Sequence, residues 1–311
     1  MSVLHRVEPM RHFLHLLDLT GEQISELLTE AIRFKAARAR RALPKPLADR
    51  VIALVFEKPS LRTRVSFESA ILQLGGSSLY LAGADVGLGW RESNADIART
   101  LNQFVDAVVL RVFKQSTLDE LARWSSIPIV NGLSDLEHPC QALADVMTIV
   151  ELFGTVAGKT VTFVGDGNNV SRSLAVAVGK LGGTFILSAP AGYGFDAEFT
   201  QWYATNIGNP LSEISDPTAA VAHADVIYTD VWTSMGQEAE REKRLKDFTG
   251  YQVNESLLAK APSHTKVLHC LPAHRDEEIT DGVMESPASV VFQQAGNRMY
   301  AQMAVLAKLV S

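Results

Sequence analysis

Short apolar runs alternate with helix-type patterns along most of this chain. The runs are Val51–Phe56, Ser78–Leu81, Ala107–Val112, Ile127–Val130, Thr160–Val164, Thr184–Ala189, Asp225–Thr229, Lys266–Cys270 and Ser289–Phe292. Strands that are separated by helices favour parallel sheets with helices on both faces. The sequence therefore predicts an α/β protein with two doubly wound parallel-sheet domains.

The chain has 311 residues, enough for two domains that each bury a core. We expect residues 1–146 to form the first domain and residues 147–295 the second, with a helix from about Pro139 to Phe153 at the joint. A C-terminal helix over 296–311 is expected to pack back onto the first domain. Polar motifs follow several predicted strands, and ligands bind at the carboxyl ends of strands in open α/β sheets. A ligand site in a cleft between the domains is therefore expected.

The composition argues against several classes of protein. Hydrophobic residues make up 47% and charged residues 21%, a balance typical of soluble globular proteins. A net charge of −6 argues against nucleic-acid binding, and no apolar run approaches the roughly 20 residues of a membrane span. Residues 1–11 contain no apolar signal core, which predicts a cytoplasmic protein.

The two cysteines, Cys140 and Cys270, lie far apart in polar motifs, so no disulfide is expected. No Cys/His spacing typical of a zinc site occurs, and we expect neither a metal nor a cofactor. The expected chemistry therefore rests on the side chains and backbone of the protein.

Hydroxyl and guanidinium groups gather directly after the first predicted strand. Ser60, Arg62 and Thr63 stand where a helix pattern begins. At a helix N-terminus the free N–H groups and the helix dipole favour an anion, and an arginine fork can hold two phosphate oxygens. Ser60 alone is equally compatible with a simple helix cap. The whole group favours a phosphate site.

Three further donors follow in the first half of the chain. Arg111 ends the apolar run Ala107–Leu110, where it can point outward or donate to a carbonyl or phosphate oxygen. His138 and Gln141 are three residues apart at the start of a predicted helix, which places them on one face. Donors of this kind beside a phosphate site can polarise a substrate carbonyl.

The segment Gly165–Ser171 follows the strand at Thr160–Val164 and opens a helix, as a dinucleotide-binding turn does. Its spacing is incomplete, because Val170 stands where the third glycine belongs. Asn168 and Asn169 would crowd a pyrophosphate and suit a small polar ligand such as an amino acid. We therefore give little weight to a nicotinamide-dependent oxidoreductase.

A further polar motif follows the strand at Asp225–Thr229. Asp230 is a candidate partner for a ligand ammonium group, with helix capping as the structural alternative. Ser234 and Met235 belong to a turn that is a candidate lid or a plain surface loop. A Trp and a Met in an otherwise polar loop favour the functional interpretation.

The segment His269–Arg275 follows the apolar stretch Lys266–Leu268. The residue before a proline avoids the helical region, so Leu271 is expected to be extended and to present the Cys270 thiol to the site. A nucleophilic cysteine–histidine pair is conceivable, but no cysteine-hydrolase signature surrounds it. We favour Cys270 as a group that contacts the substrate. Arg298 opens the last predicted helix and can supply another cation.

Four of these segments match long motifs of one family. Ser60–Thr63 resembles a carbamoyl-phosphate loop, and His138–Gln141 resembles a second phosphate-side signature. Asp230 with the turn at 234–236, and also His269–Pro272, are similar to the elements that distinguish enzymes acting on ornithine from those acting on aspartate. Nearly end to end, the chain resembles the aspartate/ornithine carbamoyltransferase family.

This resemblance implies transfer of the carbamoyl group of carbamoyl phosphate to the side-chain amine of L-ornithine, giving L-citrulline and phosphate. The residues that would hold carbamoyl phosphate are Ser60, Leu61, Arg62, Thr63, Arg111, His138, Gln141, Cys270, Leu271 and Arg298. Those that would hold ornithine are Asn169, Asp230, Ser234 and Met235. Those with an implied catalytic role are Arg111, His138, Thr63 and Cys270. The family also implies a homotrimer, or a multiple of trimers, with active sites at subunit interfaces.

The chain departs from the family pattern at two positions. Leu61 replaces the usual Thr, which is tolerated where the backbone N–H is the operative donor. Gly87 stands where many relatives have Gln or His, so no substrate contact is assigned to it. Arg91, in the same loop, can add charge to the site of a neighbouring subunit.

Two other functions stay open beside this one. A carbamoyltransferase for putrescine or an N-acylated ornithine fits the phosphate-side motifs, but Asp230 favours a free α-ammonium group. A non-catalytic binding protein on this fold is a different class, and the presence of the expected phosphate-side groups counts against it. The implied reaction fits arginine synthesis or, in reverse, arginine breakdown.

Overall fold

The computed structural model of the chain describes residues 10–208, 211–233 and 238–310. The predicted ligand contacts Ser234 and Met235 lie outside these residues. The chain divides into two compact units. Unit 1 contains residues 10–15, 33–135 and 302–310, and unit 2 contains residues 16–32 and the described part of 136–301. The domain limits predicted from the sequence stay predictions.

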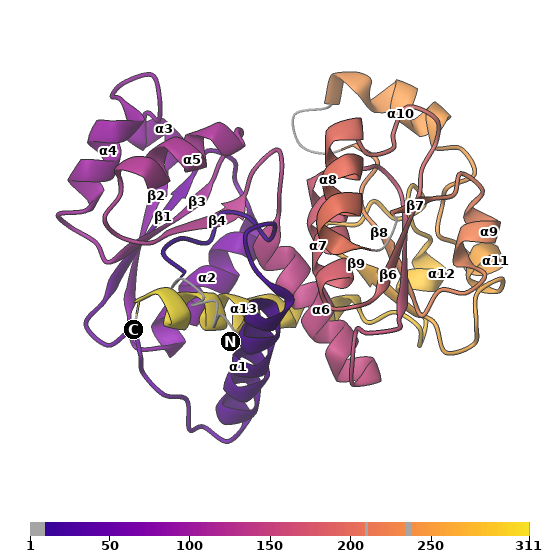
Figure 1. The fold of residues 1–311 in the computed structure, drawn as a ribbon, viewed down its shortest axis with the longest axis horizontal. Helices are drawn as coiled ribbons and strands as arrows, with labels where there is room; N and C mark the ends of the chain where they lie inside the picture. Colours follow the sequence, from indigo (N-terminus) through magenta and orange to yellow (C-terminus); the bar gives the residue numbers. More distant parts are fainter. Residues whose placement is uncertain (1–9, 209–210, 234–237, 311) are drawn as a thin grey trace, which may run out of the picture. The chain divides into compact units, whose positions relative to one another are not determined.

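Unit 1 is built on a four-stranded parallel sheet of order β2-β1-β3-β4 (Figure 1). Its strands are β1 Val51–Phe56, β2 Ser77–Ala82, β3 Ala107–Arg111 and β4 Ile129–Leu133. Its helices are α2 Leu61–Gln73, α3 Gly83–Val86, α4 Asn94–Leu101 and α5 Gln115–Trp124. The inner strands β1 and β3 are buried almost throughout, as expected for apolar runs with helices on both faces. Phe56 pairs with Arg111, so both strands end at the same edge of the sheet.

Unit 2 is built on a five-stranded parallel sheet of order β7-β6-β5-β8-β9 (Figure 1). Its strands are β5 Thr160–Val164, β6 Thr184–Ser188, β7 Ser212–Glu213, β8 Val226–Thr229 and β9 Lys266–His269. Its helices are α6 Pro139–Phe153, α7 Asn169–Lys180, α8 Ala197–Ile207, α9 Pro217–Val221, α10 Arg241–Asp247, α11 Glu255–Leu258 and α12 Asp281–Met284. A 3-10 turn, η1 Glu238–Glu240, precedes α10.

Two long helices contribute residues to both units. They are α1 Gly21–Ala39 and α13 Val291–Val310. The first turns of α1 belong to unit 2 and its last turns to unit 1, and the same holds for α13. The predicted packing of residues 296–311 onto the first domain stays a prediction.

The α/β class with two parallel sheets is confirmed. Every predicted strand except the last corresponds to a strand in one or the other of the two sheets. The predicted strand Ser289–Phe292 is wrong, because Ser289 forms only an isolated bridge with Val267 and α13 begins at Val291. For the same reason Arg298 lies inside the last helix and does not open it. The short strand β7 was not predicted, and it pairs with only Ile186 and Leu187.

Local sequence signals set the limits of α6, the predicted joint helix. Pro139 occupies its first turn, where a missing N–H costs nothing. The helix ends at Gly154, whose φ of 77° is a left-handed conformation that glycine adopts readily. The residues from Pro139 to Ile149 are all buried, so this helix is a core element of unit 2.

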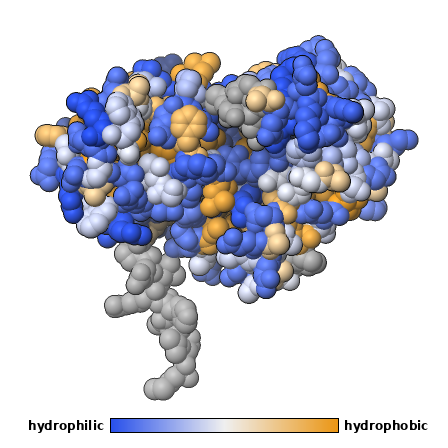
Figure 2. Space-filling view, turned by 90° about the horizontal axis from the view of Figure 1, so that it is seen from above, coloured by the Kyte–Doolittle hydropathy of each residue, from blue (hydrophilic) through white to orange (hydrophobic). Residues whose placement is uncertain are grey.

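Polar residues predominate on the face of the molecule shown in Figure 2, and its apolar residues form small separate patches. Among the described residues, no helix combines the length and the apolar character that crossing a membrane requires.

Candidate active site

The segment between β1 and α2 forms the start of the predicted phosphate site in unit 1. Ser60 is the N-cap of α2, and its Oγ accepts a hydrogen bond from the Thr63 N–H at 3.3 Å. The same hydroxyl donates to Thr63 Oγ1 at 3.1 Å. The capping alternative for Ser60 is therefore observed, and capping orients the Thr63 hydroxyl. Leu61 is 75% exposed, so its side chain packs little against the described residues.

Arg111 lies beside this segment because β3 pairs with β1. Its side chain is only 6% exposed, so it does not point outward as the structural alternative required. Arg111 Nη1 donates to Thr63 Oγ1 at 3.4 Å. Two residues that are 48 positions apart in the chain are thus brought together, as the strand-end pattern predicted.

Lys58 is a candidate site residue that sequence reasoning missed. Burial lowers its pKa, the nearby Arg111 lowers it further, and the carboxylates of Asp135 and Glu57 oppose these effects. Its Nζ lies 4.5 Å from the centre of the Phe113 ring. Lys58 therefore adds a second, half-buried cation beside Arg111. Its position directly after a buried strand, in the segment Phe56–Lys58, was the signal available in the sequence.

His138 and Gln141 lie at the start of α6 in unit 2. His138 is the N-cap residue, its N–H donates to Ser173 Oγ at 2.9 Å, and its side chain is buried. The Gln141 amide is held on both sides: Nε2 donates to Asp145 Oδ1 at 2.7 Å, and Oε1 accepts from Arg298 Nη1. Two predicted ligand contacts, Gln141 and Arg298, are therefore in direct contact.

Asp145 supports this pair from the interior of unit 2. Its Oδ1 accepts from Gln141 and also from Gln294 Nε2, each at 2.7 Å. Burial raises the pKa of Asp145 to about 7, although the hydrogen bonds from Gln141 and Gln294 lower it in part. The fully buried carboxyl thus fixes which end of the Gln141 amide faces Arg298.

Asp145→Asn should remove a pH-dependent loss of stability. The pKa of Asp145 is raised above its ordinary 3.8, so the folded state holds the proton more tightly than the unfolded chain does. The free energy of unfolding therefore falls as pH rises from about 4 to about 7, by up to about 1.4 kcal/mol per pH unit from this group. Asparagine keeps the oxygen that accepts both amides but cannot ionise.

Urea unfolding of the original protein and of Asp145→Asn at a series of pH values tests this effect. The difference between the two free energies cancels the other titrating groups. We expect it to change steadily between about pH 4 and pH 7 and to level off above that range. A constant difference would contradict the raised pKa of Asp145.

The loop between β5 and α7 is shaped by a close approach of two backbones. A Cβ at Gly167 would lie 2.7 Å from the carbonyl carbon of Gly194, so only glycine fits. Asn168 caps α7, since its Oδ1 accepts from the N–H groups of Val170 and Ser171. Gly167 is therefore explained without a dinucleotide. Asn169, a predicted ornithine contact, is the first residue of α7.

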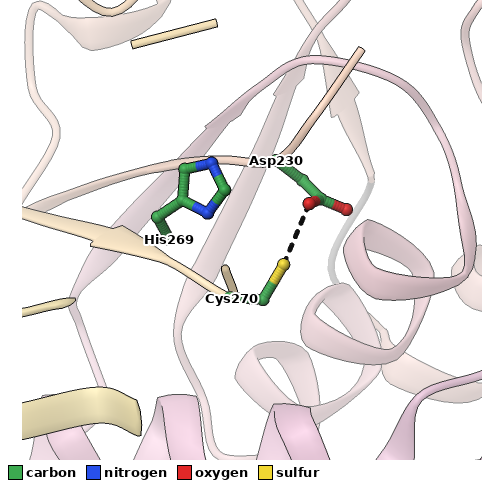
Figure 3. A group of neighbouring side chains, drawn as sticks. All are labelled: Asp230, His269 and Cys270. Carbon is green, nitrogen blue, oxygen red and sulfur yellow. Dashed lines mark hydrogen bonds between the residues drawn. The ribbon is translucent and has the colours of Figure 1, made fainter. Parts of the chain in front are cut away.

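Asp230, His269 and Cys270 come together where β8 and β9 end (Figure 3). The Cys270 thiol donates to Asp230 Oδ1 at 3.0 Å. Burial raises the pKa of Cys270 well above its ordinary value, and the Asp230 carboxylate raises it further. The side chain is therefore a protonated donor, which favours the predicted substrate contact over a thiolate nucleophile.

The His269 ring is committed to other partners. Its Nδ1 accepts from the Leu271 N–H at 2.8 Å, and its Nε2 lies 3.0 Å from Glu278 Oε1. Potential metal-ligand atoms of Asp230, His269 and Cys270 lie within 4.8 Å of one another. Because both ring nitrogens are already hydrogen-bonded, this group is better described as a hydrogen-bonding cluster than as a metal site. The absence of a metal stays a prediction.

The predicted extended conformation of Leu271 is wrong. Its φ is 60°, in the left-handed region. The tendency before proline is overridden by the tight turn in which the Leu271 N–H reaches back to His269 Nδ1. Cys270 is 8% exposed, and its thiol is directed to Asp230.

Arg244, on α10, is a second residue that the sequence did not reveal. Its Nη1 donates to Asp166 Oδ2 at 2.5 Å and to the Trp232 carbonyl at 3.0 Å. Burial raises the pKa of Asp166, and the hydrogen bond from Arg244 opposes that shift. Asp166 therefore has a cationic partner of its own.

Asp230, by contrast, has uncharged partners. They are the Asn168 amide at 3.3 Å, the Val231 N–H at 2.8 Å and the Cys270 thiol. Within the part of the chain that the structure describes, no arginine or lysine forms an ion pair with Asp230. Asp230 therefore differs from Asp166, which has a cationic partner in Arg244.

The loop conformation explains why the chain has glycine at position 87, where it departs from the family pattern. Its φ is 69°, and it ends α3 in the left-handed conformation. A Cβ there would lie 2.6 Å from Arg91 Cβ. A side chain at position 87 would require this loop to change its conformation. The turn therefore favours glycine over the Gln or His that many relatives have here.

Family models match both halves of the chain. The model described as the aspartate/ornithine carbamoyltransferase carbamoyl-P binding domain matches residues 11–151, and that of the Asp/Orn binding domain matches residues 157–309. The chain belongs to the aspartate/ornithine carbamoyltransferase family. Ser60, Arg111 and His138 fall in the first match, and Asp230 and Cys270 fall in the second.

Relatives within the aspartate/ornithine carbamoyltransferase family support this assignment. An ornithine carbamoyltransferase of Archaeoglobus fulgidus is 48% identical over 96% of this chain and 97% of its own length. An anabolic ornithine carbamoyltransferase of Pyrococcus furiosus is also 48% identical, over 96% of this chain and 95% of its own length. The solved structure of ornithine carbamoyltransferase from Pyrococcus furiosus matches with a TM-score of 0.93 and covers 96% of this chain and 97% of that one.

Proposed function

We propose that this chain transfers the carbamoyl group of carbamoyl phosphate to the side-chain amine of L-ornithine, giving L-citrulline and phosphate. The observation that carries the choice of ornithine is the set of uncharged partners around Asp230. A buried carboxylate without an ion-pair partner attracts the α-ammonium group of ornithine. Aspartate, the other amino acid in the family's description, has a single amine, which is the one that would react. It would therefore bring no second ammonium group to this carboxylate, and its extra side-chain carboxylate would be repelled.

The reaction needs little acid–base chemistry. The unprotonated side-chain amine attacks the carbonyl carbon, a C–N bond forms, and the bond from carbon to the phosphate oxygen breaks. The amine proton passes to the departing phosphate, which is itself a base. Positioning of the two substrates then supplies much of the rate, because attack requires the atoms to approach to about 3–3.5 Å.

The roles of the individual residues follow from their positions. Arg111, Thr63 and His138 would stabilise the negative charge that develops on the carbonyl oxygen. Ser60, Arg62 and the first N–H groups of α2, including that of Leu61, would hold the phosphate. Gln141, Cys270, Leu271 and Arg298 would complete the carbamoyl-phosphate site, and Asn169 and Asp230 would hold the amino-acid end of ornithine. Lys58 would add charge on the phosphate side.

The assembly and the direction of the reaction are part of the same proposal. A homotrimer, or a multiple of trimers, is proposed with active sites at subunit interfaces. Support comes from large apolar side chains of unit 1 that are exposed in the single chain, among them Leu61 at 75%, Trp90 at 75% and Phe104 at 71%. The relative named as anabolic supports a role in arginine biosynthesis. A cytoplasmic location stays a prediction.

A panel of amines tests the proposal directly. Purified protein and carbamoyl phosphate are incubated with L-ornithine, putrescine or N-acetyl-L-ornithine, and both the ureido product and phosphate are measured. We expect L-ornithine to be strongly preferred. Preference for N-acetyl-L-ornithine, whose α-nitrogen carries no charge, would overturn the role of Asp230. Preference for putrescine, which keeps that ammonium group but lacks the carboxylate, would overturn the choice of an amino acid. Either outcome would keep the carbamoyl-phosphate half. Binding of carbamoyl phosphate without turnover of any amine would favour a binding protein.

A further inference from the structure

A buried histidine–glutamate pair, His269 and Glu278, is hydrogen-bonded to the backbone of the segment that carries Cys270 and Leu271. His269 ends β9 and is fully buried, and Figure 3 shows its ring beside the Asp230–Cys270 pair. Its Nδ1 accepts the Leu271 N–H at 2.8 Å. Because Nδ1 is an acceptor, the ring proton lies on Nε2, which donates to Glu278 Oε1 at 3.0 Å. The ring therefore connects the Leu271 backbone to Glu278.

Glu278 holds the same segment at its other end. Its Oε1 also accepts from the His274 N–H at 2.6 Å. One carboxylate oxygen thus contacts the first residue of the segment 269–274 through a side chain and the last residue through its backbone. The carboxylate is fully buried, and its Oε2 has no hydrogen-bond partner among the described residues.

Two further contacts fix the start of the segment. Gln294 Oε1 accepts the His269 N–H at 2.9 Å, and the Cys270 thiol donates to Asp230. The left-handed backbone of Leu271, with a φ of 60°, is a conformation that a leucine rarely adopts. Strained backbone of this kind persists only where surrounding contacts hold it.

We propose that Glu278 and His269 are positioning residues, which hold the backbone of Cys270 and Leu271 in the geometry that carbamoyl transfer requires. The inference rests on the proposed function, since it assigns these residues to that reaction. Neither residue touches a substrate in this proposal. They act by fixing the position of the Leu271 backbone and of the Cys270 thiol relative to the reacting group.

The unpartnered Glu278 Oε2 makes the proposal specific. Both hydrogen bonds go to Oε1, so the role needs one acceptor oxygen and no negative charge. Glu278→Gln keeps that oxygen and should retain kcat to within a few-fold. Glu278→Ala removes it and should lower kcat by about 10²-fold, as a misplacement of about 1 Å does. The Kd for carbamoyl phosphate should change much less, because most of its proposed contacts are made elsewhere.

Two histidine variants separate the hydrogen bond of His269 to the Leu271 N–H from its hydrogen bond to Glu278. Asparagine at position 269 can accept from the Leu271 N–H as Nδ1 does, and glutamine can donate to Glu278 as Nε2 does. His269→Asn and His269→Gln should each lose less activity than His269→Ala. Glu277→Gln is the matched control, because Glu277 precedes Glu278 but its carboxylate pairs with Arg241 and, at 3.6 Å, with the exposed His274 ring instead of with the backbone of the segment. Its kcat should be unchanged.

The variants are compared by kcat, by KM for L-ornithine, by Kd for carbamoyl phosphate and by thermal unfolding. Glu278→Ala with normal kcat and a lowered unfolding temperature would reduce the pair to a structural role and overturn the proposal. An equal loss in Glu278→Gln and Glu278→Ala would also overturn it, because charge would then be the operative property. Should Glu278→Ala not fold, the test is the kcat of His269→Asn and of His269→Gln compared with that of His269→Ala. An equal loss in all three would overturn the proposal.

An observation that does not use activity separates this inference from the proposed function. In protein labelled with ¹⁵N-histidine, His269 should show the tautomer with its proton on Nε2, and Glu278→Gln should keep it. A proton on Nδ1 would overturn the pair whatever the enzyme does. Failure of every amine in the panel, with the expected tautomer present, would instead overturn the proposed function and leave the pair in place.

Discussion

Arg111→Ala is expected to lower kcat for citrulline formation by about 10²–10³-fold, the usual effect of removing one donor to a developing oxyanion. The buried guanidinium donates to Thr63 Oγ1, so it is held beside the start of α2 before any substrate arrives. A donor that is already in place costs no reorganisation during the reaction. We expect kcat to fall more than the affinity for carbamoyl phosphate, because the α2 N–H groups and Arg62 are unchanged.

The fold should survive this substitution. Arg111 joins the sheet through its backbone, whose carbonyl accepts from the Glu57 N–H at 2.8 Å, and alanine keeps that bond. The matched control is Arg64→Ala on the same helix as Thr63. Arg64 is exposed and pairs with Glu68 across one helical turn, a contact worth only about 0.3–0.5 kcal/mol. Steady-state assays of both variants test the assignment, and near-normal turnover by Arg111→Ala would remove Arg111 from the mechanism.

Much of the fold could be predicted because the strands of a parallel sheet are buried on both faces. The runs at Val51–Phe56 and Ala107–Arg111 are continuous and apolar, and they are the inner strands β1 and β3. The error at Ser289–Phe292 arises because a short apolar run is compatible with a strand or with the buried start of a helix. Val291 is buried in either case, so periodicity alone does not separate the two.

The candidate site could be predicted where its residues follow a strand and not where they lie on a distant element. Thr63 and Arg111 meet because two neighbouring strands end at one edge, which is a property of the pattern. Arg244 reaches Asp166 from a helix 78 positions away, and no local spacing reports such a contact. The same holds for Glu278. A glutamate in an acidic segment is predicted to be exposed, whereas Glu278 is fully buried.

Asp230→Asn is expected to lower kcat/KM for L-ornithine by about 10²–10³-fold, mainly through KM. Removing one partner of a buried, hydrogen-bonded charge pair costs about 2–5 kcal/mol, and each 1.4 kcal/mol is about tenfold. Asparagine has the same size, and its oxygen can still accept from the Cys270 thiol and the Val231 N–H, which both use Oδ1. The substitution therefore removes the charge and leaves most of the local contacts.

One contact does change in Asp230→Asn. The Asn168 amide donates to Asp230 Oδ2 and cannot turn over, because its own oxygen caps α7. Asp196→Asn is a control for the removal of a carboxylate elsewhere in unit 2. Asparagine caps α8 equally well, and the substitution loses only the charge that pairs with Arg172. Its kcat/KM should equal that of the original protein.

5-Aminopentanoate distinguishes loss of the ammonium contact from general damage to the site. It is ornithine without the α-amino group, so its slow carbamoylation should depend little on the charge of Asp230. The preference for L-ornithine over 5-aminopentanoate should therefore narrow in Asp230→Asn, while the carbamoyl-phosphate KM stays close to its original value. An equal loss with both amines would mean that the substitution disturbs the site as a whole, and the α-ammonium assignment of Asp230 would be wrong.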